Sequence, residues 1–171
     1  MKSKVKIYRM SSYASMPQKG SVHAVGWDIR SDLSMLAREE YDKKIPNTLF
    51  DEFLEDFSIT LKPQEVKVLP TGLKVELEKD MEMDIKPRSG LFSRNGILAA
   101  GTIDPDYRGE IGIMMINLGP KVVEIKHGER LAQAVLRKVY NEDSLFFEVG
   151  DEKELTPTER GQGGFGSTGI K

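Results

Sequence analysis

Five short, glycine-containing clusters bring together arginines, carboxylates, hydroxyls and aromatic rings. They lie at residues 24–29, 87–90, 101–109, 128–133 and 160–169. Cations and backbone N–H groups bind phosphates, carboxylates hold a metal ion or a water, and aromatic rings cover sugars and bases. Each cluster alone is explained by a turn, a buried ion pair or a loose chain end. Together they supply the chemistry of a nucleotide site.

Familiar phosphate and calcium motifs are excluded by their surroundings. Residues 161–166 satisfy G-x-G-x-x-G, but a dinucleotide site needs a helix after the motif, and the chain ends at 171. No Gly-Lys-Ser/Thr closes a P-loop. Asp104, Asp106 and Gly109 imitate the start of an EF-hand, yet Met115 stands where the bidentate glutamate belongs.

The composition predicts a single cytoplasmic domain. The chain has 171 residues, of which 39% are hydrophobic and 30% charged, and its mean hydropathy of -0.40 is too polar for a membrane protein. A balance of 25 Lys+Arg against 27 Asp+Glu provides no basic field for nucleic acid. Cys is 0 and the two histidines, His23 and His127, lack ligand spacing, so disulfides and zinc are not expected. Residues 1–4 do not start a signal peptide.

Short strands must position these clusters. Residues 73–78 alternate strictly between apolar and charged types, which is typical of a half-buried strand. The 8 prolines leave little room for long helices. Many short strands separated by turns predict an all-β barrel or sandwich. The other expected strands are 5–8, 58–61, 66–68, 111–116, 121–125, 131–140 and 145–149.

One region departs from the strand pattern. Residues 48–57 combine capping-box spacing between Thr48 and Asp51 with apolar residues at helical spacing, which predicts an amphipathic helix with an acidic outer face. Residues 34–44 form a second, weaker helix candidate. The segment of about 35–57 is therefore interpreted as a short helical insertion. It either caps the barrel or a neighbouring chain, or docks a protein partner.

The C-terminus has a different composition. Glycines 161, 163, 164, 166 and 169 crowd the end of the chain, and such a segment loses too much entropy to order alone. The expected organisation is a single β domain over 1–159, followed by a flexible, Gly-rich C-terminal arm over 160–171.

The five clusters, in this order, resemble the five motifs of the trimeric dUTP diphosphatases (dUTPases). The likeness runs from about residue 23 to 169, and the segments RGQGGFGSTG and GTIDPDYRGE are its most specific parts. The resemblance implies a jelly-roll-like dUTPase β-barrel and a homotrimer. It also implies hydrolysis of dUTP to dUMP and pyrophosphate with Mg²⁺.

The resemblance assigns roles in the third motif. Asp104 matches the aspartate that orients the attacking water, and Tyr107 matches the tyrosine that lies against the deoxyribose. Backbone groups of Gly101, Thr102 and Ile103 are implied to read the uracil edge. In the other motifs the phosphate-binding positions are Arg88, Ser89, Gly90 and Gln133, while Asp28 reaches the Mg²⁺ through water.

The arm matches the family's last motif. Arg160 corresponds to the arginine that reaches the γ-phosphate, and Phe165 to the aromatic ring stacked over uracil. Gly164, Gly166 and Ser167 match backbone donors to the phosphates. The arm would then be a lid over a site that three chains share.

Two other functions are weighed against this one. A dCTP deaminase shares the fold, but its general-base glutamate should lie ten residues after Asp104, where this chain has Met114. A non-catalytic or moonlighting nucleotide-binding regulator would use the helical insertion to contact another protein. The full set of motif residues argues against loss of catalysis but leaves a second, binding role open.

Overall fold

The chain folds into two compact units, residues 1–139 and 140–171. The computed structural model describes residues 5–44, 49–142 and 146–163. The described part of the second unit contains one short 3-10 helix, η1 (Glu152–Glu154). A domain boundary between 159 and 160 stays a prediction. None of the helices in the described ranges has both the length and the apolar character of a membrane span.

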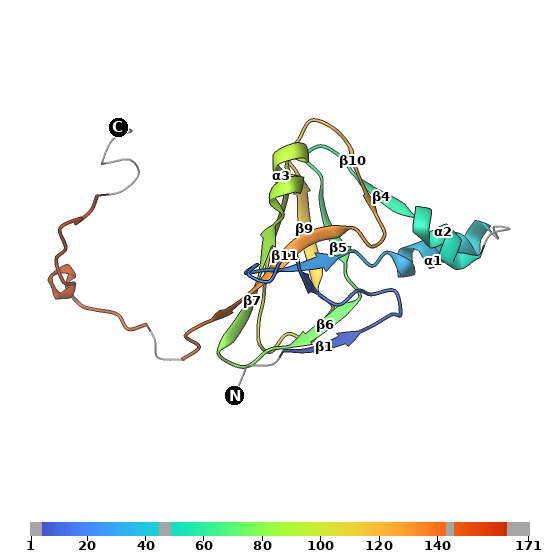
Figure 1. Ribbon diagram of the computed structural model, residues 1–171. Helices are drawn as coiled ribbons and strands as arrows, with labels where there is room; N and C mark the ends of the chain where they lie inside the picture. Colours follow the sequence, from blue (N-terminus) through green and yellow to red (C-terminus); the bar gives the residue numbers. More distant parts are fainter. Residues whose placement is uncertain (1–4, 45–48, 143–145, 164–171) are drawn as a thin grey trace. The chain divides into compact units, whose positions relative to one another are not determined.

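The first unit is built from short strands and three short helices among its described residues (Figure 1). In chain order they are β1 (Lys6–Arg9), β2 (Gln18–Lys19), β3 (Trp27–Arg30), α1 (Ser34–Lys44), α2 (Phe50–Asp56), β4 (Ser58–Leu61), β5 (Val66–Pro70), β6 (Leu73–Glu76), β7 (Met81–Pro87), α3 (Ser89–Asn95), β8 (Ile97–Ile103), β9 (Gly112–Asn117), β10 (Val123–Lys126) and β11 (Arg130–Lys138).

All strand pairs described are antiparallel. A seven-stranded sheet has the order β2-β3-β11-β7-β8-β9-β5, and two smaller ladders join β1 to β6 and β10 to β4. The mostly β architecture confirms the all-β, jelly-roll-like prediction. It places the ends of β3, β7 and β11 side by side, because β11 lies between the other two.

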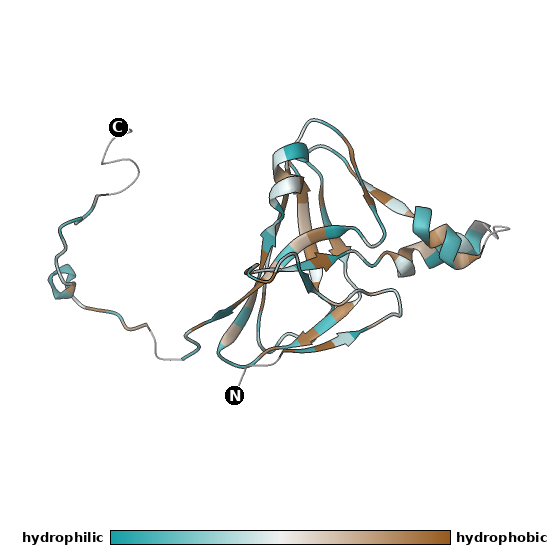
Figure 2. Cartoon of the chain, viewed as in Figure 1, coloured by the Kyte–Doolittle hydropathy of each residue, from teal (hydrophilic) through white to brown (hydrophobic). Residues whose placement is uncertain are grey.

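Alternation along the strands builds the core. On β7 the side chains of Met81, Met83 and Ile85 are buried, while the charged residues between them are not. Figure 2 shows hydrophobic and hydrophilic residues alternating along the strands in this way. The buried Asn117 is fully paired, since its amide donates to Leu61 O (2.9 Å) and Lys121 O (2.7 Å).

The predicted helical insertion is present as α1 and α2. Its interior is aromatic: the Tyr41 ring centroid lies 5.4 Å from that of Phe50 and 5.6 Å from that of Phe53. The guanidinium of Arg38 lies 3.4 Å from the Phe50 ring centroid, a cation–π contact. These contacts hold two helices that are too short to be stable alone.

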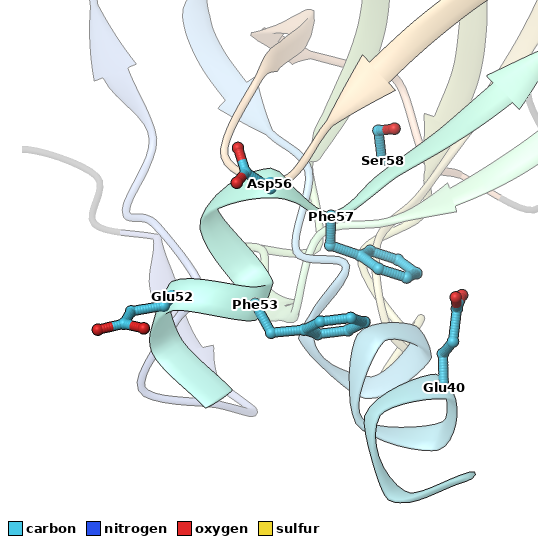
Figure 3. Close-up of a pocket in the computed structure, with 6 residues that line it drawn as sticks. All are labelled: Glu40, Glu52, Phe53, Asp56, Phe57 and Ser58. Carbon is cyan, nitrogen blue, oxygen red and sulfur yellow. The ribbon is translucent and has the colours of Figure 1, made fainter. Parts of the chain in front are cut away.

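A cavity of about 540 Å³ opens beside α2. Figure 3 shows the Phe53 and Phe57 rings pointing to the same side of α2, toward the helix that carries Glu40. Glu52 and Asp56 also line it, so the cavity combines carboxylates with aromatic rings. A partner at this insertion stays a prediction.

The insertion is anchored to the barrel at Asp32. The buried Asp32 carboxylate accepts the backbone N–H of Ser34 (3.0 Å) at the start of α1, and also the Ser11 hydroxyl. The neighbouring Leu33 N–H donates to Nδ1 of His127 (3.1 Å). Because Nδ1 accepts this bond, the structure requires the neutral imidazole.

The His127 contact makes stability depend on pH. Burial lowers the pKa of His127 below its ordinary value of 6.5, and the Asp32 carboxylate opposes this only in part. The unfolded chain therefore binds a proton more readily than the folded one. The stabilisation from the neutral His127 is fully present above the pKa of the unfolded chain. It is lost as the pH falls from that value through the lower pKa of the folded chain.

We expect the melting temperature of the wild type to drop more between pH 7.5 and 5.5 than that of His127→Asn, whose side-chain oxygen can still accept the Leu33 N–H. Differential scanning calorimetry at both pH values measures this. Equal drops for the two proteins would contradict the assignment.

Two predicted elements differ in the structure. Residues 146–149 of the expected strand 145–149 form no strand. Helix α2 begins at Phe50, and its N-cap, Leu49, makes no side-chain capping bond. Thr48, the predicted cap, lies outside the described residues. Asp51 accepts a hydrogen bond from the Tyr13 hydroxyl instead.

Candidate active site

Asp28 is the centre of a polar cluster at one rim of the sheet. The residue is 7% exposed, and Oδ2 lies 3.1 Å from a guanidinium nitrogen of Arg130. Oδ1 lies 3.5 Å from Nε of Arg88 and 3.4 Å from Nε2 of Gln133. Two guanidinium groups against one carboxylate leave one net positive charge. The cluster is therefore suited to an anion.

Strand pairing brings these residues together. Gln133 of β11 stands opposite Asp28 of β3, so both side chains lie on the same face of the sheet. A register shift between Arg130 and Ala132 interrupts the ladder. Such a bulge re-aims a side chain, and here the Arg130 side chain contacts Asp28.

Arg130 is a functional candidate that sequence reasoning missed. Its guanidinium contacts Asp28, and its backbone oxygen accepts a hydrogen bond from Arg88 (3.1 Å). It therefore holds both the carboxylate and the arginine of the cluster. The sequence signal that could have identified it is a basic residue inside the fourth cluster. The direction of its side chain, however, depends on the bulge.

Arg88, Ser89 and Gly90 follow β7 directly. Arg88 is the N-cap residue of α3, with extended backbone angles, and Ser89 and Gly90 open the helix. The first N–H groups of a helix have no partner within it. These N–H groups lie beside the arginine cluster and can donate hydrogen bonds to the oxygen atoms of an anion.

The third motif forms the end of β8 and the loop after it. Gly101 has φ +155°, which side-chain-bearing residues rarely adopt. Thr102 is exposed and Ile103 is buried. Asp104 is exposed, and its backbone oxygen accepts the Tyr107 N–H (3.2 Å) in a turn.

One chain does not bring Asp104 to Arg88. Strands β7 and β8 pair with Met83 opposite Ile103 and Ile85 opposite Gly101. Asp104 therefore continues past one end of this ladder, and Arg88 lies beyond the other end. At about 3.4 Å per residue, the two positions are roughly 20 Å apart along the strands.

The arm residues are only partly described. Arg160 is exposed, and its Nε donates to Gly163 O (2.8 Å) within the second unit. The other predicted arm residues, Gly164, Phe165, Gly166 and Ser167, lie outside the described residues.

The carboxylates of the site fit a metal ion only through an indirect contact, in which a water lies between Asp28 and the ion. No group of three or more His, Asp or Glu side chains in the described ranges could enclose a cation. The Asp28 carboxylate has about four acceptor positions, so it can bind a water in addition to its three side-chain partners. Mg²⁺ keeps several waters and favours phosphate oxygens, which fits such an indirect contact.

The chain thus combines an antiparallel β fold, a rim with two arginines against Asp28, and a separate loop that carries Asp104. A family model described as dUTPase matches residues 54–169. The chain belongs to the dUTPase family, which confirms the resemblance drawn from the five clusters and the enzyme class.

Curated relatives agree with this assignment. The deoxyuridine 5'-triphosphate nucleotidohydrolase of Heliobacterium modesticaldum is 34% identical over 171 residues, covering 98% of this chain and 97% of that protein. The protein of the same name from Clostridium novyi is 48% identical over 115 residues, covering 66% of this chain and 78% of that one.

Solved structures share the fold. A mutant dUTPase of Staphylococcus bacteriophage 80alpha with dUpNHpp has a TM-score of 0.74 at 22% identity, covering 98% of this chain and 99% of that one. A dUTPase from phage phi11 of S. aureus, solved to visualise a species-specific insert, has a TM-score of 0.67 at 19% identity. It covers 89% of this chain and 99% of that one.

Proposed function

We propose that this chain hydrolyses dUTP to dUMP and pyrophosphate. Family membership supports the reaction. The observation that assigns the phosphate site to particular residues is the arginine cluster around Asp28, which has a net positive charge. A triphosphate carries about four negative charges, so electrostatics dominates its recognition. Arg88, Ser89, Gly90 and Gln133 bind the phosphates.

Asp104 orients the water that attacks the α-phosphorus. A new bond forms between the water oxygen and phosphorus, and the bond from phosphorus to the bridging oxygen of pyrophosphate breaks. The carboxylate aligns the water and accepts its proton as the bond forms. The exposure of Asp104 leaves it open to water before the substrate arrives.

The β8 end reads the nucleoside. Backbone groups of Gly101, Thr102 and Ile103 pair with the uracil edge, and Tyr107 lies against the sugar where a 2′-hydroxyl would project. Cytosine leaves these backbone groups unpaired, so the site discriminates strongly against it.

Asp28 would hold Mg²⁺ through water, and the ion would supply positive charge to the phosphates of a bound nucleotide. The net positive charge of the arginine cluster disfavours a cation on its own. We therefore expect isothermal titration calorimetry to detect no Mg²⁺ binding to the protein alone, but clear binding with a slowly cleaved dUTP analogue. EDTA is expected to abolish most turnover. Tight Mg²⁺ binding without nucleotide would contradict this role for Asp28.

The active unit is a homotrimer with shared sites. The separation of about 20 Å between Asp104 and Arg88 supports this, because one site needs both. Exposed apolar residues supply surface for association: Val66 (61%) and Val68 (63%) lie on one face of β5, with Met114 opposite Val68 on β9. Each site takes Asp104 from one copy, the Asp28 cluster from a second and the arm from a third.

Pyrophosphate release tests the proposed function. Wild-type protein with Mg²⁺ is expected to release pyrophosphate from dUTP at least about 100-fold faster, as kcat/KM, than from dCTP, dTTP or UTP. Comparable rates for all four nucleotides, or ammonia release from dCTP, would overturn it.

A further inference from the structure

The loop between β8 and β9 is closed by its own hydrogen bonds. Tyr107 N–H donates to Asp104 O (3.2 Å), and the Arg108 guanidinium donates to Pro105 O (2.7 Å) and Tyr107 O (2.9 Å). The Tyr107 hydroxyl donates to the backbone oxygen of Glu110 (2.9 Å). The tyrosine ring is thus folded back across its own loop.

Only glycine at position 109 permits this ring position. A Cβ on Gly109 would lie 2.2 Å from the Tyr107 hydroxyl oxygen and 2.4 Å from the ring carbon that bears it. Both distances are far below van der Waals contact. The backbone of Gly109 does not have a left-handed φ, so alanine is allowed there. An alanine would therefore displace the tyrosine ring and leave the loop backbone in place.

Glu110 fixes the acceptor of the tyrosine hydroxyl. Its Oε1 accepts the backbone N–H groups of Thr71 (3.0 Å) and Gly72 (2.7 Å). The next residue, Ile111, accepts a hydrogen bond from the buried Thr71 hydroxyl (2.7 Å). These bonds tie the Glu110 backbone to the barrel, so the hydroxyl of Tyr107 is held at a fixed point.

We propose that Gly109 and Glu110 are positioning residues that hold the Tyr107 ring in place, and that they thereby set the discrimination between deoxyribose and ribose. Tyr107 is 44% exposed, so part of this residue is open to a ligand. The hydrogen bond to Glu110 O and the contact with Gly109 fix the ring, so it presents a preformed surface. A ring fixed in this way cannot move aside for a 2′-hydroxyl. The inference rests on the proposed function, because that function places the sugar against Tyr107.

The test is the ratio of kcat/KM for dUTP to kcat/KM for UTP. Gly109→Ala is expected to lower this ratio about 10-fold or more. In a Tyr107→Ala background the same change should have no further effect, because there is no ring to displace. Gly20→Ala, where a Cβ meets nothing within 4 Å, is the matched control and should keep the wild-type ratio.

Glu110 is tested by a pair of variants. Glu110→Ala should lower the ratio, whereas Glu110→Gln should restore it, because the amide oxygen can accept the same two N–H groups. A loss of folding alone would lower turnover with both nucleotides and would leave the ratio unchanged.

A crystal structure of Gly109→Ala supplies a readout independent of activity, and should show the Tyr107 hydroxyl beyond hydrogen-bonding distance of Glu110 O. A wild-type ratio in Gly109→Ala, an equal loss in the Tyr107→Ala background, or an unmoved ring would overturn the inference while leaving dUTP hydrolysis intact. If wild-type protein releases no pyrophosphate from dUTP, the proposed function itself is wrong.

Discussion

Asp104→Asn is expected to bind dUTP but to lose about 10³-fold in kcat, since general-base positioning of water contributes on this scale. The asparagine side chain has nearly the same shape and can still hydrogen-bond the water, but it cannot accept the proton. Asp104 is exposed, so the variant should fold normally. Single-turnover pyrophosphate release and calorimetric binding of a slowly cleaved analogue separate the two effects.

Asp106→Asn is the matched control. Asp106 is another exposed carboxylate on the same loop, and it has no role in the proposed reaction. It should keep kcat within about 3-fold of the wild type. Full turnover by Asp104→Asn would contradict the role of the Asp104 carboxylate, and equal losses in both variants would show that the charge of the loop matters instead.

Removal of residues 160–171 has the second-largest expected effect, a fall in kcat of about 100-fold or more. The deletion removes the Arg160 charge that the family resemblance assigns to the γ-phosphate, and the Phe165 ring that it assigns to the face of uracil. Arg160 is exposed, and its described bond stays within the second unit, so the barrel should keep its melting temperature.

Arg160→Lys separates the contribution of the Arg160 guanidinium from that of the later arm residues. It keeps a cation and every later residue, but it cannot form the planar, two-pronged contact of a guanidinium with phosphate. Its kcat should fall between those of the wild type and the truncated chain. Equal turnover by the truncated and full-length proteins would contradict the role of the arm.

Much of the architecture could be predicted from hydrophobic patterns in the sequence that have a strong physical cause. The alternation at 73–78 predicted β6, and the helix expected at 34–44 is α1 with the same bounds. Strands β7 and β8 were not anticipated. Their buried positions include Met81, Met83 and Ala99, which are residue types that signal a strand weakly. Helix α3 has 7 residues, too few to show a helical period.

The site was less predictable than the elements. The clusters containing Asp28, Arg88 and Gln133 were recognised, and strand order brings these residues together. The contact of Arg130 with Asp28 depends on a bulge in β11. The residue types of this strand do not predict that bulge. Asp104 belongs to the predicted set but lies at the far end of the β7–β8 ladder, a distance that only the register reveals.

The segment 145–149 was predicted as a strand, but residues 146–149 form none. Alternation reports what a segment would bury in a sheet, and a strand exists only when a partner is present. Phe146 is 93% exposed and Phe147 is 85% exposed.

Complementation between two inactive variants tests most directly whether Asp104 of one copy works with Arg88 of another. Asp104→Asn and Arg88→Ala are unfolded together in equal amounts, refolded, and assayed for pyrophosphate release from dUTP. Random mixing gives about a quarter of the sites both native residues, so about a quarter of wild-type activity should return. The double variant mixed with wild type should also give about a quarter, rather than the half expected for sites within one chain. No recovery in the first mixture, with half in the second, would contradict a site shared between copies.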